Sequence, residues 1–254
     1  MRIARYECGG RARWGLADLE SGKIREIAGE PFVRVETAGD ARPLEEVRLL
    51  PPVVPGKIVA VGLNYKDHAR ELGMKIPEEP LLFLKAPSAL VGPGGEIVYP
   101  PQSRRVDYEA ELAVVIGRVA KNVKERDAPA HILGYTCIND VTARDLQMKD
   151  VQFARSKGFD TFAPLGPWVV TDFEPTEASV RCLVNGEVRQ DGNTREMIAS
   201  VYRIVEYISS VMTLFPGDVI ATGTPPGVGS LRVGDVVTVE VGGIGALTNR
   251  VVAP

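Results

Sequence analysis

The sequence is poor in cysteine. Its 254 residues include only three, Cys8, Cys137 and Cys182, which are widely separated and form no C-x-x-C pair. Neither a disulfide framework nor a zinc–thiolate site is therefore indicated. Such cysteine usage is typical of a protein that works in a reducing compartment.

Long hydrophobic runs are lacking as well. Apolar runs such as LAVVI at 112–116 are far shorter than the roughly 20 residues of a membrane-spanning helix. The amino terminus, MRIARYECGG, has arginines but no apolar region of the kind that signal peptides contain. These observations predict a soluble, cytoplasmic protein without membrane partners.

Neither sign of charge is in large excess. Thirty Lys and Arg residues face 33 Asp and Glu residues, which gives a net charge of -3, and no block of like charges stands out. This balance argues against nucleic acid as the main partner. Histidine is scarce too, because only His68 and His131 are present.

Prolines divide the chain into two unequal parts. The N-terminal part shows short alternating segments separated by glycines, which predicts a small β meander. Pro51, Pro52 and Pro55 then interrupt the pattern, because proline does not fit inside a helix or a central strand. We predict a small N-terminal β domain over residues 1–52 and a larger, catalytic domain over residues 53–254.

Short strand patterns dominate the second part. Segments such as KIVAVGL, PLLFLKA, YEAELAVVIG and DVVTVEV are bounded by glycine or proline, which predicts a mainly β (α+β) fold. Few helices are expected, and their predicted ranges are 65–72, 127–132, 142–153 and 194–214.

One strand pattern, YEAELAVVIG at 108–117, carries two carboxylates. Side chains alternate along a strand, so Glu109 and Glu111 point to the same side. At the edge of a sheet they would simply face solvent. In an internal strand, each unpaired carboxylate would cost several kcal/mol, roughly, so they would need a cation, a metal ion or shared protons.

Two further sites allow both a functional and a structural interpretation. His68 and Glu71 are spaced i and i+3 on a predicted helix, where the carboxylate could orient the imidazole as a general base or both could simply be solvated. Asp140 lies between a strand and a helix. It could cap the helix, or complete with the two glutamates an oxygen site for Mg²⁺ or Mn²⁺.

Taken in order, five segments resemble the fumarylacetoacetate hydrolase family: GLNYKDHARE, DYEAELAVVIG, NDVTARDLQ, KGFDTFAPLGPWVV and GDVIATGTPPGVG. The resemblance covers roughly residues 57–250, and residues 1–52 resemble the small N-terminal β domain of some prokaryotic members. It implies a mixed β-sheet roll with few helices, usually a homodimer, and one Mg²⁺ or Mn²⁺ ion. By the resemblance, the metal ligands are Glu109, Glu111 and Asp140.

The resemblance also implies roles for other side chains. The catalytic residues it implies are His68, Glu71 and Lys157. The residues implied to contact substrate are Arg144, Gln147 and Thr224. Thr161 is implied to support the water shell of the metal.

The implied substrates are 2-oxo or 2-hydroxy-dienoic acids, whose carboxylate and neighbouring oxygen can chelate a metal ion. The favoured activity is isomerisation of 2-hydroxyhepta-2,4-diene-1,7-dioate in aromatic catabolism. Alternatives are hydrolysis of acylpyruvates such as fumarylpyruvate, decarboxylation or tautomerisation of oxaloacetate, and a catalytically inactive metal-binding module. The segment 73–80 is predicted to make the His68 helix part of a lid.

Overall fold

The computed structural model describes residues 1–71 and 73–254. Strands outnumber helices and form mixed sheets, which confirms the mainly β fold class. The described helices are α1 (Lys66–Glu71), α2 (Arg144–Lys149), α3 (Ala154–Lys157) and α4 (Val201–Val211), with 3-10 helices η1 (Leu44–Glu46), η2 (Pro87–Ala89), η3 (Glu125–His131) and η4 (Thr194–Glu196). None of these helices is long and apolar enough to cross a membrane.

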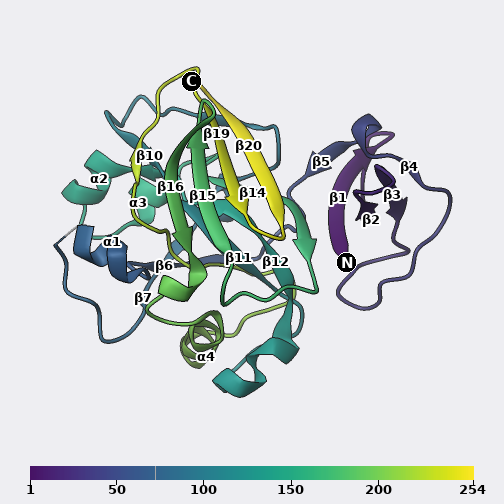
Figure 1. Cartoon of the computed structure of the whole chain (residues 1–254), viewed down its shortest axis with the longest axis horizontal. Coiled ribbons are helices and arrows are strands. Elements are labelled where there is room, and N and C mark those ends of the chain that lie inside the picture. Colours follow the sequence, from purple (N-terminus) through teal and green to yellow (C-terminus); the bar gives the residue numbers. More distant parts are fainter. Residues whose placement is uncertain (72) are drawn as a thin grey trace.

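The N-terminal part forms the predicted β meander. Its strands are β1 (Arg2–Cys8), β2 (Arg11–Asp18), β3 (Lys23–Glu26), β4 (Arg42–Pro43) and β5 (Arg48–Leu50). Figure 1 shows them grouped at one side of the molecule. The start of β1 pairs with β14 (Ala163–Val170) through Arg2 and Ile3, so this meander belongs to the large sheet. The domain boundary near residue 52 stays a prediction.

The large sheet has 12 strands and holds the centre of the core. Its path runs β4-β3-β2-β1-β14-β12-β11-β17-β6-β7. Off this path, β5 pairs with β1, and β8 pairs with β14. The strands not yet given are β6 (Ile58–Gly62), β7 (Leu81–Lys85), β8 (Leu90–Val91), β11 (Ala110–Ile116), β12 (Ile132–Asn139) and β17 (Val219–Ala221). β17 pairs with β6 in parallel and with β11 in antiparallel orientation, so the sheet is mixed.

Two smaller sheets complete the fold. The five-stranded sheet runs β16-β15-β19-β20-β9, and its strands are β9 (Glu96–Val98), β15 (Ser179–Val184), β16 (Glu187–Asn193), β19 (Val236–Val241) and β20 (Gly245–Val252). It packs on β11, β12 and β14. The three-stranded sheet runs β13-β10-β18, with β10 (Val106–Tyr108), β13 (Thr142–Ala143) and β18 (Gly229–Ser230).

The glutamate-bearing segment is internal. β11 lies between β12 and β17, and all seven of its residues are buried. The pattern at 108–117 is also two strands rather than one, because β10 ends at Tyr108 and Glu109 lies in the gap before β11. The solvent-facing edge interpretation of Glu109 and Glu111 was therefore wrong, and both carboxylates need partners.

Three predicted helices begin or end elsewhere. Over 142–153, Thr142 and Ala143 pair with β10 as a strand, and α2 ends at Lys149 because Asp150 has extended backbone angles. Over 127–132 the helix is the 3-10 helix η3, and Ile132 already begins β12. Over 65–72 the helix is α1, while Leu72 lies outside the described residues.

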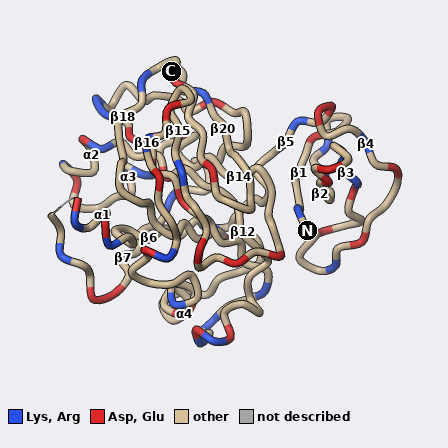
Figure 2. The backbone as a smooth tube through the Cα atoms, viewed as in Figure 1, with Lys and Arg blue, Asp and Glu red and all other residues tan. Residues whose placement is uncertain are grey.

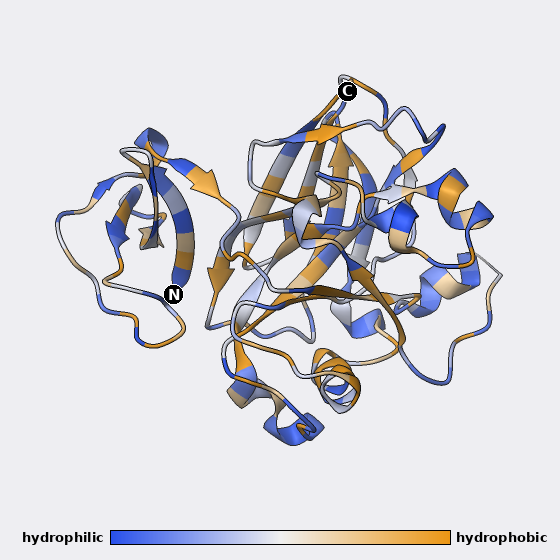
Figure 3. Ribbon diagram, turned by 180° about the vertical axis from the view of Figure 1, so that it is seen from behind, coloured by the Kyte–Doolittle hydropathy of each residue, from blue (hydrophilic) through white to orange (hydrophobic). Residues whose placement is uncertain are grey.

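The fourth predicted helix, 194–214, was too long. Ser200 accepts a hydrogen bond from the Arg203 backbone nitrogen at 3.1 Å and so caps α4, which begins only at Val201. Met212 has extended backbone angles and ends it. The helix carries both hydrophobic and hydrophilic residues (Figure 3) and packs its buried side on η3.

Close strand packing predicts a large effect of one glycine substitution. A Cβ atom at Gly134 of β12 would lie 2.4 Å from the Val170 carbonyl oxygen. Because this is backbone on a neighbouring strand, Gly134→Ala should destabilise the fold by about 2–3 kcal/mol in urea unfolding. In the control Gly62→Ala, the Cβ would meet only the half-exposed Leu81 side chain, so a loss below about 1 kcal/mol is expected. Equal losses would contradict this account.

Candidate active site

Strand register brings three carboxylates together. β11 pairs with β12 so that Ala110 lies opposite Asn139, and the Asp140 backbone nitrogen donates to the Glu109 carbonyl oxygen at 2.8 Å. The start of β11 and the end of β12 therefore lie side by side at the same end of these two internal strands. Carboxylate oxygens of Glu109, Glu111 and Asp140 lie within 4.8 Å of one another, and all three side chains are buried. The three predicted metal ligands thus form one cluster.

Lys157 neutralises part of this cluster. Its Nζ donates to Glu109 Oε2 at 2.8 Å and to Asp140 Oδ2 at 2.6 Å, and its side chain is 2% exposed. Burial alone would lower the pKa of Lys157, but the carboxylates of Asp140 and Glu109 raise it above its usual value. The ammonium group therefore stays charged at neutral pH.

Arg144 holds the same glutamate from the other side. Its guanidinium donates to Glu109 Oε1, to Asp107 Oδ2 at 2.9 Å and to Gln147 Oε1 at 2.5 Å. Burial would raise the pKa of Glu109, but Lys157 and Arg144 lower it to about 2. Arg144 thus orients a predicted metal ligand as well as lining the cavity, and its predicted contact with substrate stays a prediction.

Of the three carboxylates, Glu111 has the fewest charged partners to offset the cost of its burial. Its Oε2 accepts from the Gly223 backbone nitrogen at 2.7 Å, and no ion pair to it occurs within residues 1–71 and 73–254. Burial, together with the carboxylates of Asp140 and Glu109, raises the pKa of Glu111 well above its usual value. A cation between the three carboxylates would remove this cost.

The donor set fits a hard divalent ion. All three candidate ligands offer oxygen, which Mg²⁺ and Mn²⁺ prefer, and three carboxylates leave room in an octahedral shell for water or substrate. Three cations contact the cluster: Lys157 and Lys85 bind its carboxylates, and Arg144 also serves Asp107 and Gln147. The oxygen donor set is therefore compatible with a bound divalent ion.

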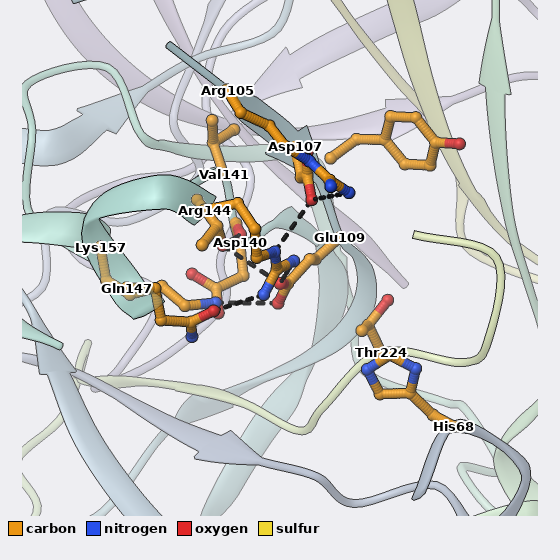
Figure 4. A network of polar contacts seen from close by, with 12 residues as sticks. His68, Arg105, Asp107, Glu109, Asp140, Val141, Arg144, Gln147, Lys157 and Thr224 are labelled. Atoms are coloured by element: carbon orange, nitrogen blue, oxygen red, sulfur yellow. Dashed lines mark hydrogen bonds and ion pairs between the residues drawn. The ribbon is translucent and has the colours of Figure 1, made fainter. Parts of the chain in front are cut away.

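The histidine–glutamate pair is formed as well. His68 Nδ1 lies 2.9 Å from Glu71 Oε2, and the Glu71 carboxylate also accepts from the Gly227 backbone nitrogen at 3.2 and 3.3 Å. A carboxylate accepts hydrogen bonds, so Nδ1 carries the proton and Nε2 is left as the basic nitrogen. Figure 4 shows His68 apart from the group of Lys157, Asp140 and Gln147.

One cavity of about 150 Å³ joins these groups. The predicted site residues that line it are His68, Glu109, Glu111, Asp140, Arg144, Gln147, Lys157 and Thr224. Its apolar wall is formed by Val61, Leu63, Met74, Leu81, Phe83 and Phe153. Acid–base, metal-ligating and cationic groups therefore share a space that is partly lined by hydrophobic side chains.

Thr161 is placed elsewhere among the described residues. It does not line this cavity, and its hydroxyl accepts a hydrogen bond from the Val98 backbone nitrogen at 2.9 Å. Its backbone has a φ of 67°. The structure therefore gives Thr161 a role in the local backbone, and its implied role in a water shell stays a prediction.

Two buried polar side chains near the site were not predicted from the sequence. Gln190 of β16 accepts from the Ala110 backbone nitrogen at 3.0 Å and donates to Thr224 Oγ1 at 2.8 Å and to the Pro225 carbonyl at 2.7 Å. Lys85, at the end of β7, donates to Asp140 Oδ1 at 2.5 Å. A lysine that ends the apolar run PLLFLKA was the available signal for Lys85.

Comparisons with known proteins agree with this arrangement. Residues 57–252 match the fumarylacetoacetate (FAA) hydrolase C-terminal family, and residues 1–52 match the Rv2993c-like N-terminal family. The protein is an enzyme of the fumarylacetoacetate hydrolase family. The resemblance of the five ordered segments is thereby confirmed.

Relatives within the family differ in their reactions. The chain is 47% identical to human mitochondrial oxaloacetate tautomerase FAHD2A, over 83% of this chain and 71% of that protein. A 2-hydroxyhepta-2,4-diene-1,7-dioate isomerase from Mycobacterium marinum is 45% identical, with a TM-score of 0.92 and coverage of 100% and 98%. A maleylpyruvate hydrolase from Sphingobium sp. SYK-6, in complex with manganese(II) and pyruvate, is 31% identical, with a TM-score of 0.83 and coverage of 100% and 99%.

Charged residues elsewhere are evenly mixed. Figure 2 shows Lys and Arg interspersed with Asp and Glu along the chain. Many of the surface ion pairs join neighbours in sequence, such as Arg70 with Asp67 and Arg203 with Glu206. The charge pattern therefore offers no competing site comparable to the buried cluster within the described residues.

Proposed function

We propose that the protein is a divalent-metal-dependent isomerase of 2-oxo and 2-hydroxy-dienoic acids, with 2-hydroxyhepta-2,4-diene-1,7-dioate as its substrate. The observation that carries this proposal is the cavity that three buried carboxylates, Lys157 and His68 line together, with Glu71 beside the His68 ring at 2.9 Å. The isomerase relative from M. marinum supports the choice of substrate.

The chain's own residues account for the proton chemistry. A divalent ion held by Glu109, Glu111 and Asp140 would supply Lewis acidity toward a chelated carboxylate and 2-oxo oxygen. The Lys157 ammonium lies beside this cluster and would stabilise the enolate charge that develops there. His68 Nε2 would take a proton from one carbon and return it to another, while Glu71 holds the ring in the required tautomer.

The apolar wall serves the same chemistry. Side chains such as Phe83, Phe153 and Leu63 line the same cavity as the carboxylates. They exclude water from the carbon skeleton of the substrate, which strengthens the electrostatic interactions inside. Proton transfer between carbons is thereby favoured over attack by water.

Tautomerisation of oxaloacetate is the second candidate. It is favoured by the small cavity of about 150 Å³ and by the 47% identity to the human oxaloacetate tautomerase. This reaction moves a proton between carbon 3 and the 2-oxo oxygen, so His68 and Lys157 would keep the same roles. Hydrolysis of an acylpyruvate needs, in addition, a water placed for attack on the distal carbonyl.

A substrate panel tests the proposal. We expect the protein with Mg²⁺ or Mn²⁺ to isomerise 2-hydroxyhepta-2,4-diene-1,7-dioate. The reaction is measured by the loss of the substrate's ultraviolet absorbance and by deuterium incorporation in D₂O. Oxaloacetate, acetylpyruvate and fumarylpyruvate complete the panel. Release of pyruvate from fumarylpyruvate as the fastest reaction would replace the isomerase by a hydrolase. No conversion of any compound would favour an inactive metal-binding module.

Two properties remain predictions, namely the homodimer that the resemblance implies and the lid over segment 73–80. β7 lies at the end of the path of the large sheet, and its Leu81 and Leu84 side chains are 47% and 51% exposed. Such an edge would be covered in a dimer.

Met74, in the predicted lid segment 73–80, lines the cavity, which supports closure over substrate. Light scattering and hydrogen exchange with and without oxalate and Mg²⁺ would test the two properties.

A further inference from the structure

Asp140 is held by two different lysines, one on each carboxylate oxygen. Lys157 Nζ lies 2.6 Å from Oδ2, and Lys85 Nζ lies 2.5 Å from Oδ1. Lys85 also donates to the Val141 carbonyl oxygen at 3.2 Å, and its side chain is 0% exposed. The carboxylate is therefore held between two lysine amino groups that come from different elements, β7 and α3.

The two lysines lie on different sides of Asp140 with respect to the cavity. Lys157 lines the cavity, whereas Lys85 is absent from the described residues that line it. Lys157 also shares its ammonium with Glu109, while Lys85 is directed to Asp140 and the adjacent Val141 carbonyl. Lys85 therefore has no direct access to a substrate and can act only through Asp140.

Burying a lysine is costly, which argues against stability as its main role. A buried ion pair is often no more stabilising than well-packed apolar side chains of similar volume. Asp140 already has a charged partner in Lys157. A methionine at position 85 would fill a similar volume. We therefore expect the buried amino group of Lys85 to act in the site itself.

Coordination chemistry offers this role. A carboxylate can bind a metal ion through one oxygen or through both, and Mg²⁺ and Mn²⁺ accept about six ligands. With one oxygen from each of Glu109, Glu111 and Asp140, three positions are left, and a chelating 2-oxo acid needs two of them. If Asp140 bound through both oxygens, it would occupy one of those positions.

We propose that Lys85 is a positioning residue that holds Oδ1 of Asp140 on the side away from the cavity, so that this carboxylate would offer one oxygen to a bound divalent ion and would leave positions open for a chelating 2-oxo acid. The inference rests on the proposed metal-dependent function. It assigns Lys85 to substrate chelation, although the side chain itself does not contact substrate.

The variant Lys85→Met tests the proposal with two binding measurements. Mn²⁺ affinity is measured by electron paramagnetic resonance of free Mn²⁺, and oxalate affinity of the Mn²⁺-loaded protein is measured by calorimetry. We expect Mn²⁺ to bind as tightly as in the unaltered protein or more tightly, because a nearby positive charge is lost and Oδ1 is released. Oxalate should bind at least about 10-fold more weakly, because Asp140 then competes for a chelating position.

A matched control is provided by Lys57, which pairs with the buried Asp218 at 2.5 Å outside the cavity. Lys57→Met should leave both affinities unchanged, and thermal melts of the two variants compare the general cost of losing a lysine that pairs with a buried aspartate. If Lys85→Met does not fold, Lys85→Leu, which also lacks a hydrogen-bond donor, is measured in the same way.

The outcomes separate this inference from the proposed function. A parallel loss of Mn²⁺ and oxalate affinity in the Lys85 variant would indicate a general structural role and overturn the inference. Unchanged oxalate affinity would overturn it as well, because Asp140 would then not compete. If the unaltered protein binds no Mn²⁺, the proposed function itself fails.

Discussion

Asp140→Ala should abolish tight binding of Mn²⁺ and, with it, turnover. The substitution removes one of three oxygen ligands and leaves the ammonium groups of Lys85 and Lys157 without the carboxylate that both contact. Because burial lowers the pKa of Lys85 and Asp140 is the main group that opposes this, the charge left to repel a divalent ion in this medium of low dielectric constant is chiefly that of Lys157. We therefore expect a loss beyond the roughly 10–100-fold that changes around a metal ligand typically cause.

Titration of Mn²⁺ and thermal melts with and without millimolar Mg²⁺ would measure this loss. The unaltered protein should melt at a higher temperature when the ion is present, because a ligand that binds the folded state stabilises it. Asp140→Ala should show no such increase. Asp218→Ala removes another buried aspartate, paired with Lys57 outside the cavity, and should keep the full response to metal.

Two results would contradict the ligand assignment. The first is an unaltered protein whose melting temperature does not respond to either ion, as expected for a scaffold with an incidental carboxylate cluster. The second is an Asp140→Ala variant that binds Mn²⁺ with unchanged affinity. If this variant does not fold, Asp140→Asn preserves the shape of the side chain and allows the same titration.

His68→Ala should lower kcat by about 10²–10⁴-fold while leaving Mn²⁺ affinity unchanged, since general acid–base groups typically contribute that much. The imidazole lines the cavity and is oriented by Glu71 at 2.9 Å, but it makes no described contact with the three carboxylates. Its loss therefore removes proton transfer and leaves the metal ligands in place. Steady-state kinetics at saturating metal would measure the effect.

The other histidine supplies the control. Among the described residues, His131 does not line the cavity, and its Nδ1 lies 2.9 Å from the Val119 carbonyl oxygen. His131→Ala should keep kcat and KM. Full activity of His68→Ala would remove this residue from the mechanism. A parallel loss of Mn²⁺ affinity would show that His68 supports the metal site instead.

Several features of the site could be predicted because they depend on local sequence. Strand alternation placed Glu109 and Glu111 on one side, and the spacing of His68 and Glu71 placed them on one helical face. The structure confirms both arrangements. The ordered segments of the family also indicated which carboxylate, Asp140, would join the two glutamates.

Helix ends and strand breaks were predicted less well, because contacts between distant segments decide them. Thr142 and Ala143 follow a helical pattern but pair with β10 instead. Tyr108 and Ala110 belong to different strands, since β10 and β11 pair with different neighbours. Propensity and periodicity report local preference, and tertiary pairing overrides it at such positions.

By itself, the sequence determined the mainly β class, the shared side of the two glutamates, the histidine–glutamate pair and the membership of the family, all of which depend on short or ordered segments. Only the tertiary structure decided that β11 is an internal strand, and that its carboxylates are therefore buried. It alone showed Lys85 on Asp140, because 55 residues separate the two. Long-range strand order and side-chain approach follow from packing of the whole chain, which no local pattern contains.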